Sequence, residues 1–386
     1  MPGLLTRSRV ALLVGLVACT VLSAAPNAQS RVAAPPRKAP KTAPPPKDWP
    51  DARTLASRQQ DAENRRLFRE VAPLAITITA DFKAVDRDRN PASTKTFPAT
   101  LQFTKDDGST GALDVQLRTR GHMRRLFATC DFAPLRIEFQ KDQVKGTVFD
   151  RQTALKLGTH CRNIKEVEQY VLLEYSAYRI NNLLTPRSFR ARLATATYID
   201  SVAKKPLGTH HAMFIEDDED VARRAGGRLT DRKDDLHWLD MEQFTRMTLF
   251  EYLIGNTYMS ILAQHNVRLV QMQNRTVYPV PYDFDYSGLV NALYAVPPRE
   301  LTLASVRDRL FRGPCRTMPQ LQSVLSEMRA VRPALRAIYD ELAGLGLDPK
   351  RQKRTLDYLD EFYRLIDRPA EVKLAFLTDC LKNGLM

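Results

Sequence analysis

The densest group of residues that could do chemistry reads Pro-Tyr-Asp-Phe-Asp-Tyr-Ser-Gly and runs from Pro281 to Gly288. Two carboxylates, Asp283 and Asp285, follow a short apolar strand and stand among aromatic residues. Magnesium prefers oxygen ligands and usually keeps positions open for waters and the phosphates of a substrate. The segment therefore predicts a site for Mg2+ (or Mn2+) at Asp283 and Asp285. The alternative is a turn whose carboxylates cap the next segment.

A second group of polar residues precedes this segment. It contains Gly-Asn-Thr-Tyr, which ends at Tyr258, and Gln-His-Asn, which ends at Asn266. Asn266 stands just before a strand that forms a short hairpin with the strand leading to Asp283. An Asn and an Asp at opposite ends of one hairpin can converge on one metal ion, so Asn266 is predicted to be a further ligand. His265 is interpreted as a packed or capping histidine rather than a catalytic base.

The elements that must position these residues follow from the spacing of apolar side chains. Residues 71–216 are predicted to form a β-rich N-terminal lobe that contains one long helix. Residues 217–386 are predicted to form a helical C-terminal lobe that contains the hairpin of the metal site. Strands are expected at residues 74–82, 99–104, 112–117, 135–139, 154–157, 191–199 and 211–215, and helices at residues 164–184, 241–254, 318–345 and 351–381.

This order of elements matches protein-kinase-like folds, in which an antiparallel β lobe with one long helix precedes a mainly helical lobe. We therefore predict an α+β, two-lobed, protein-kinase-like fold with the site between the lobes. Order alone is weak support, because many α+β proteins share it.

Specific segments resemble a known family. The run His-Asn-Val at 265–267 and the run from Pro281 to Asn291 resemble the metal-binding half of the CotH-type, protein-kinase-like family, in its uncharacterised exported bacterial branch. The resemblance extends from about Ala72 to Val296 and is most specific at Asp-Phe-Asp. It implies phosphoryl transfer from ATP with a divalent metal, with Asp283 and Asn266 as metal ligands. Further segments that fit lie at 118–121, 130–135, 155–161, 175–180, 185–190, 214–217 and 221–224.

The resemblance also implies a Lys or Arg from the β-rich part that holds the phosphates, and a Glu on the long helix that pairs with this cation. Phosphoryl transfer depends mainly on positioning and charge neutralisation, so such a cation is needed. The candidates for the cation are Lys156 and Arg136, with Arg118 and Arg120 nearby in the sequence, and the candidates for its partner are Glu174 and Glu168.

One position departs from the family pattern. The family segment Gly-Asn-Thr-Asp-Trp reads Gly-Asn-Thr-Tyr-Met here, which places Tyr258 where the catalytic Asp is expected. Tyrosine has a reference pKa near 10 and is a poor base at neutral pH. Two functional hypotheses follow. The first is a Mg-ATP-dependent phosphotransferase acting on an envelope or secreted protein. The second is a non-catalytic, pseudokinase-like protein that binds a partner or assists envelope assembly.

The first 30 residues are predicted to direct export. Two arginines precede the apolar run Val10–Ala18, which is too short to span a bilayer but suits a signal peptide. Two cleavage sites compete: one after Ser-Ala-Ala at 23–25, and a lipobox whose Cys19 would carry a lipid anchor. The expected location is accordingly periplasmic, cell-surface lipoprotein or secreted, with membrane contact only through Cys19.

Residues 31–70 are predicted to be a Pro-rich linker followed by a charged helical segment. Seven of the twenty residues at 31–50 are proline, a composition that favours extended chain over a packed core. The net charge of the 386-residue chain is +14, and residues 1–70 contain 12 Lys and Arg against 5 Asp and Glu. The rest of the chain is only mildly basic, so its charge does not indicate nucleic-acid binding.

Four cysteines remain after the signal region: Cys130, Cys161, Cys315 and Cys380. An even number in an exported protein favours two disulfides, and four free thiols are the alternative. Cys130 and Cys161 bracket neighbouring strands, and the other two lie in the helical part. We therefore predict the pairs Cys130–Cys161 and Cys315–Cys380.

Overall fold

The computed structural model describes residues 46, 48–378 and 380–381, which belong to one compact unit of the chain. The predicted export signal, its two cleavage sites and most of the Pro-rich linker lie outside the described residues. The charged segment that follows the linker forms helix α1 (Ala52–Glu63), as expected.

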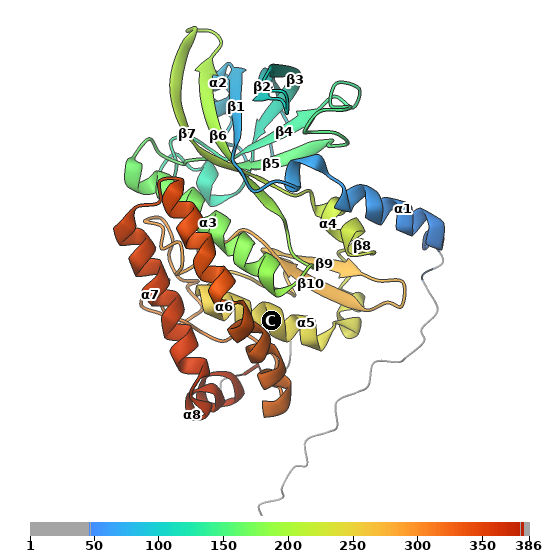
Figure 1. The fold of residues 1–386 in the computed structure, drawn as a ribbon, viewed down its shortest axis with the longest axis vertical. Helices are drawn as coiled ribbons and strands as arrows, with labels where there is room; N and C mark the ends of the chain where they lie inside the picture. Colours follow the sequence, from blue (N-terminus) through green and yellow to red (C-terminus); the bar gives the residue numbers. More distant parts are fainter. Residues whose placement is uncertain (1–45, 47, 379, 382–386) are drawn as a thin grey trace, which may run out of the picture. The chain divides into compact units, whose positions relative to one another are not determined.

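Seven strands form a closed barrel (Figure 1). Each strand pairs with its neighbour in the order β1-β2-β3-β4-β5-β7-β6, and β6 returns to β1. All pairs are antiparallel except β1 with β6, which run parallel from Leu74↔Ala194 to Ala80↔Asp200. The strands are β1 (Leu74–Ala80), β2 (Phe97–Thr104), β3 (Thr110–Thr119), β4 (Leu135–Phe139), β5 (Ala154–Gly158), β6 (Ala191–Asp200) and β7 (Lys205–Ile215).

The expected two-lobed, protein-kinase-like fold with an antiparallel β lobe is therefore wrong. The strands predicted from the sequence exist, but they close into a mixed barrel through the parallel β1–β6 pair. Alternating apolar residues tell which face of a strand is buried, and they do not tell which strand lies beside it. Closure of the barrel depends on that long-range pairing.

The barrel interior forms its own apolar core, to which β1, β2 and β3 contribute alternate buried residues. The β2–β3 connection contains Gly108, whose φ of 79° suits a residue without a side chain. This pattern explains why the hairpin was predictable, because period-two burial and a turn glycine are both local signals.

Helix α3 (Lys165–Leu184) follows β5 and packs against α6 (Met318–Gly344) as well as β6 and β7. Its apolar residues join the large helical core rather than the barrel core. Two glutamates in its first turn stabilise the helix, because their negative charges lie at the positive end of the helix dipole. The helix ends at Leu184, before a Thr-Pro pair that disfavours helical backbone.

The C-terminal helices lie below the barrel in Figure 1. Helix α7 (Pro349–Ile366) packs on α6, and α8 (Pro369–Lys373) leads into a short π-helical turn at Leu374–Thr378. The single helix predicted over residues 351–381 is therefore interrupted. Pro369 lacks the N–H that a continuous helix needs, so it starts a new helix instead.

A small antiparallel sheet in the order β10-β9-β8 lies next to α5 (Met241–Ile254). Its strands are β8 (Arg228–Thr230), β9 (Val267–Gln271) and β10 (Val277–Pro281). Helix α5 ends at Gly255, whose φ is 66° and where a Cβ would lie 1.9 Å from the Tyr358 hydroxyl. Only glycine fits there, and it turns the chain toward the site.

The described residues also form two short helices, α2 (Phe82–Arg87) and α4 (Asp218–Arg224). Neither was predicted from the sequence. Helix α4 begins directly after β7, and Asp217 caps it by accepting a hydrogen bond from the Glu219 N–H. Strand β7 ends at Ile215, and the described residues on both sides of the predicted boundary between 216 and 217 belong to one compact unit.

Both predicted disulfides are confirmed, Cys130–Cys161 and Cys315–Cys380. Disulfides persist in oxidising compartments, so the two bridges indicate an extracytoplasmic environment. Within the described part of the chain, every helix is too short or too polar to span a bilayer.

Candidate functional site

A cavity of about 70 Å³ joins three segments that are far apart in the sequence. The first is the β3–β4 loop, from Arg120 to Arg124. The second lies between α5 and β9 and contributes Tyr258 and Asn266. The third follows β10 and contributes Asp283 and Asp285, among others. The cavity is therefore lined by the residues predicted for the metal site and by Tyr258, which stands where the catalytic Asp is expected.

The β9–β10 hairpin explains why Asn266 and Asp283 meet. Val267 pairs with Pro281 at the end of the ladder, and the Tyr282 N–H donates to the Asn266 carbonyl at 3.0 Å. Asn266 therefore lies opposite Tyr282 across the hairpin, and Asp283 is the next residue along the chain. The sequence-based inference that the two ends of the hairpin converge agrees with this register.

Both residues have left-handed backbones, with φ of 54° at Asn266 and 66° at Asp283. Asn and Asp tolerate this region better than most residues, and such conformations often mark functional sites. The Asp283 N–H donates to the Tyr178 hydroxyl at 3.0 Å. The Asn266 side-chain N–H donates to the Tyr258 carbonyl at 3.0 Å, so its amide oxygen is the polar atom left to face a ligand.

Asp285 is buried beside Asp283 and accepts a hydrogen bond from the Tyr294 hydroxyl at 3.0 Å. Burial, and then the negative charge of Asp283, raise the pKa of Asp285 to about 6, while Arg124 opposes the shift. Without a cation in the cavity, the two carboxylates repel each other. A bound cation would reverse this effect and favour the ionised form of both.

Arg124 and Glu174 form a largely buried ion pair close to the two carboxylates. Arg124 Nη1 lies 3.6 Å from Glu174 Oε2, and Arg124 Nη2 donates to the Thr159 carbonyl at 2.5 Å. Burial raises the pKa of Glu174 well above its usual value, Asp285 raises it further, and Arg124 opposes the shift. Arg124 Nε is buried and has no hydrogen-bond partner among the described residues, so the guanidinium retains unused donor capacity.

Sequence reasoning missed Arg124, although it named Arg120 as a neighbour of the expected cation. The signal is the dense basic run Arg-Thr-Arg-Gly-His-Met-Arg-Arg at 118–125, which covers the last two residues of β3 and the loop after it. A loop after a strand can place several positively charged side chains at one site. Glu174 was expected to pair with Lys156 or Arg136, and it pairs with Arg124 instead.

Lys156 and Arg136 do not line the cavity. Lys156 forms an ion pair with Asp218, and its ammonium lies 4.9 Å from the centre of the Tyr282 ring. Burial, then like charges nearby, lower the pKa of Lys156, and Asp218 opposes this. Arg136 stands opposite Lys156 in the barrel ladder and lies 3.6 Å from Glu138. Glu168 accepts from the His211 N–H, away from both cations.

Tyr258 forms part of the cavity wall. Its ring stacks on Tyr286 with centroids 4.9 Å apart, and it meets His265 edge-on at 4.9 Å. The Tyr258 N–H donates to the Asn256 side chain at 3.0 Å. Partial burial lowers the pKa of His265, but the residue is exposed overall, in contrast to its interpretation as a packed histidine.

Comparison with known proteins adds no assignment. No protein-family model matches the chain, and no curated protein matches it.

The oxygen atoms of Asp283, Asp285 and Asn266 can hold a metal ion only if water or a bound substrate completes its coordination shell. Among residues 48–378, no group of three or more His, Cys, Asp and Glu side chains is placed to hold a metal ion. Two carboxylates and one amide oxygen do not make an all-protein cage. They do suit Mg2+, which commonly takes one or two carboxylates and completes its shell with water and substrate phosphates.

Asp285→Asn is expected to stabilise the protein at pH 8 in the absence of metal. The pKa of Asp285 is raised, so between pH 4 and 6 the unfolded chain loses this proton first, and stability falls as pH rises. A shift of about two units corresponds to about 3 kcal/mol of unfolding free energy above pH 6. Asn has nearly the same shape, can still accept from Tyr294 and carries no charge.

Urea denaturation at pH 4 and pH 8 measures this effect. The gain should appear at pH 8 and nearly vanish at pH 4. The exposed Asp234, replaced by Asn, serves as the control and should show no such difference. An equal effect of Asp285→Asn at both pH values would contradict the prediction.

Proposed function

We propose that this protein is an extracytoplasmic, Mg2+-dependent phosphotransferase that takes its phosphoryl group from ATP and transfers it to an envelope or secreted protein. The observation that supports the proposal is the meeting of two carboxylates with two arginines in one small cavity, Asp283 and Asp285 with Arg120 and Arg124. Phosphoryl transfer needs both kinds of charge, because the metal binds carboxylates and the phosphoryl oxygens need cations. The CotH-type resemblance of the 281–291 segment is consistent with this chemistry.

The residues have distinct roles in this proposal. Asp283, Asp285 and the Asn266 amide oxygen would hold Mg2+, which neutralises charge on the phosphates when bound. Arg120 and Arg124 bind phosphoryl oxygens, and planar guanidinium groups suit this task. Glu174 and the Thr159 carbonyl hold the Arg124 guanidinium in its orientation.

The size of the cavity limits what enters it. A volume of about 70 Å³ accommodates a metal ion with a phosphoryl group and not an entire nucleotide. The remainder of ATP must therefore lie outside. Lys156 and Arg268 flank the ring of Tyr282, the residue that precedes Asp283, and both pair with Asp218, so they are our candidates for contacts with the outer phosphates.

Asp283→Asn is expected to abolish stabilisation by Mg-ATP. In the wild type, Mg-ATP at 100 times its dissociation constant should add about 2.7 kcal/mol to the free energy of unfolding. Asn tolerates the left-handed backbone of position 283, so the variant should fold normally while it lacks the charge. Thermal denaturation with ATP, Mg2+ and both together measures the effect.

Asp357→Asn is the matched control, because Asp357 is an exposed residue of α7 whose ion pair with Lys353 is on the surface. It should keep the full response to Mg-ATP. Stabilisation of Asp283→Asn equal to that of the wild type would show that the metal site lies elsewhere. Stabilisation of the wild type by ATP without Mg2+ would refute the metal dependence.

The second candidate is a pseudokinase-like protein that binds a phosphorylated ligand without transferring phosphate. The observation that favours it is Tyr258, which stands in the cavity wall stacked on Tyr286 instead of a carboxylate base. Radiolabelled phosphate transfer separates the two candidates. Mg-ATP binding without measurable transfer to any acceptor would favour the second.

A further inference from the structure

One face of helix α3 is linked to both carboxylates of the cavity. Tyr170, Glu174 and Tyr178 are spaced four residues apart, so they form one stripe along the helix, which we call the α3 stripe. Their exposed fractions are 4%, 3% and 1%, so the whole stripe is buried. Glu174 in the middle pairs with Arg124. The two tyrosines lie about one helical turn before and one turn after it.

Tyr178 holds the backbone of Asp283. Its hydroxyl accepts a hydrogen bond from the Asp283 N–H at 3.0 Å, and its ring packs on Phe284 with centroids 4.8 Å apart. Asp283 has a left-handed backbone with φ of 66°, a conformation that persists only where the surrounding structure fixes it. The Tyr178 hydroxyl supplies such a constraint, because it orients the peptide group that leads into Asp283.

Tyr170 is connected to Asp285 through the chain that follows the two carboxylates. The Tyr170 hydroxyl accepts a hydrogen bond from the Leu293 N–H at 3.1 Å. The next residue, Tyr294, donates its hydroxyl proton to Asp285 at 3.0 Å, and its ring meets that of Tyr170 edge-on with centroids 6.0 Å apart. The Leu293 side chain is 84% exposed, so its own packing does not fix this segment. Tyr170 therefore helps to place the hydrogen-bond partner of Asp285.

Both tyrosines act on the cavity from behind. Neither Tyr170 nor Tyr178 is among the described residues that line it. Burial, and then the negative charges of Glu174 and Asp283, raise the pKa of Tyr178 well above its usual value, so its hydroxyl stays neutral at physiological pH. A neutral hydroxyl behind the cavity wall contributes no charge to a bound metal ion. Its effect on the site is through the position of Asp283.

We propose that Tyr170 and Tyr178 are positioning residues that set the orientation of Asp285 and Asp283 for Mg2+. This inference rests on the proposed function. Mg2+ demands nearly octahedral geometry, whereas Ca2+ accepts a variable number of oxygen ligands in a flexible arrangement. A displaced carboxylate should therefore weaken binding of Mg-ATP much more than binding of Ca-ATP. A general loss of stability should weaken both alike.

Tyr178→Phe removes the hydroxyl and keeps the buried ring, so the variant should fold. Calorimetric titration of the mature protein with Mg-ATP and with Ca-ATP measures the effect. The affinity for Mg-ATP should fall by about fivefold or more, the effect of one lost hydrogen bond, and that for Ca-ATP by less than about twofold. Tyr170→Phe should shift the ratio of the two affinities in the same direction by a smaller factor, because it acts through Leu293 and Tyr294.

Tyr339→Phe is the matched control. Tyr339 is a fully buried tyrosine of α6, and its hydroxyl lies 2.9 Å from the Oγ of Ser176, an α3 residue outside the α3 stripe. This variant also loses a buried hydroxyl beside the same helix. It should keep the wild-type ratio of the two affinities, with a melting temperature lowered about as much as that of Tyr178→Phe.

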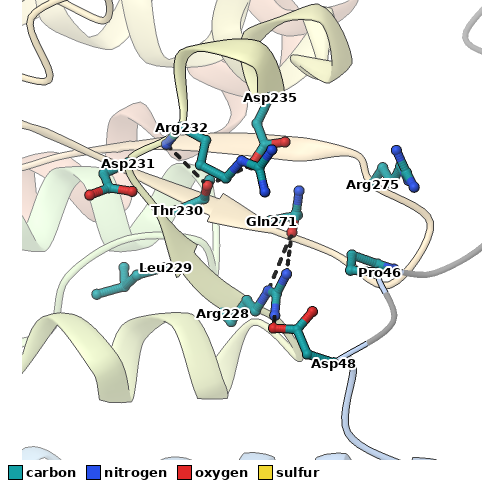
Figure 2. Close-up of a pocket in the computed structure, with 10 residues that line it drawn as sticks. All are labelled: Pro46, Asp48, Arg228, Leu229, Thr230, Asp231, Arg232, Asp235, Gln271 and Arg275. Carbon is teal, nitrogen blue, oxygen red and sulfur yellow. Dashed lines mark hydrogen bonds and ion pairs between the residues drawn. The ribbon is translucent and has the colours of Figure 1, made fainter.

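A second control concerns a larger pocket on β8, with a volume of about 490 Å³ (Figure 2). Three arginines and three aspartates line it, and Arg228 already pairs with Asp48. Figure 2 also shows Arg232 in this lining. Arg232→Ala removes one of the three positive charges, and it should leave the affinities for Mg-ATP and Ca-ATP unchanged.

The outcomes separate this inference from the proposed function. Absence of Mg-ATP binding by the wild type would refute the proposed function, and the positioning roles with it. If the wild type binds and Tyr178→Phe binds equally well, or loses Mg-ATP and Ca-ATP affinity equally, the role of Tyr178 is wrong and the proposed function stands. An unchanged ratio in Tyr170→Phe would refute the role of Tyr170. Loss of binding in Arg232→Ala would place the nucleotide in the β8 pocket and overturn both.

Discussion

Removal of the Cys130–Cys161 disulfide is expected to lower both stability and affinity for Mg-ATP, whereas removal of Cys315–Cys380 should lower stability alone. By chain-entropy arithmetic, each bridge contributes about 4 kcal/mol to the free energy of unfolding. The first bridge has an additional role because it ties down the β3–β4 loop. Arg120 and Arg124, the two arginines of the cavity, both lie on that loop.

The contacts around this bridge explain the expected loss of affinity. Cys161 follows β5, and its carbonyl accepts from the Phe132 N–H at 2.9 Å. Arg162 donates to the Thr129 carbonyl at 2.9 Å, and Arg124 donates to the Thr159 carbonyl. Without the covalent link, the loop is held by hydrogen bonds alone, including those from the Arg89 guanidinium to the carbonyls of Arg125, Cys130 and Asp131. A small displacement of the arginines would then weaken phosphate binding, which requires both to be in place.

Two double variants test this prediction, Cys130→Ser with Cys161→Ser and Cys315→Ser with Cys380→Ser. The first should lower the affinity for Mg-ATP by about tenfold or more, the equivalent of 1.4 kcal/mol, and the second should leave it near the wild-type value. Urea denaturation and calorimetric titration supply the two measurements. Equal loss of affinity in both variants would mean that stability in general, and not the position of the loop, controls binding.

Tyr258→Asp is expected to raise the rate of phosphoryl transfer by about tenfold or more, which is a lower bound for the effect of a positioned general base. Tyr258 lines the cavity next to Asn266 and Asp283, so a carboxylate at this position would be able to accept or orient the proton of the acceptor hydroxyl. The substitution removes the stacking of Tyr258 on Tyr286, which lowers the free energy of unfolding by about 1 kcal/mol. The gain in rate should therefore come with a slightly lower melting temperature.

Tyr258→Phe is the matched control because it keeps the stacked ring and lacks the hydroxyl. It should transfer phosphate at the wild-type rate. Radiolabelled transfer to the protein itself and to a generic acceptor, with melting curves for each variant, measures the outcome. Robust transfer by the wild type that disappears in Tyr258→Phe would contradict the prediction and would make the tyrosine hydroxyl itself functional.

The local features of this protein were predictable from its sequence. The convergence of Asn266 and Asp283 follows from one short hairpin, in which two strands of five residues leave little freedom of register. The long helix α3 follows from its apolar residues and from the Thr-Pro pair after it. The disulfide pairs follow because each joins cysteines of the same part of the chain. In each case the partners belong to the same part of the chain, although the Cys315–Cys380 bridge spans 65 residues.

Only the tertiary structure decided how distant segments meet. The parallel pairing of β1 with β6 closes the barrel, and more than 100 residues separate Leu74 from Ala194. The pairing of Arg124 with Glu174 depends on where the β3–β4 loop crosses α3, which periodicity does not encode. For the same reason Lys156, a plausible phosphate ligand by sequence, pairs with Asp218. Side-chain type and spacing determine what an element can bury, whereas the choice among long-range partners depends on the packing of the whole chain.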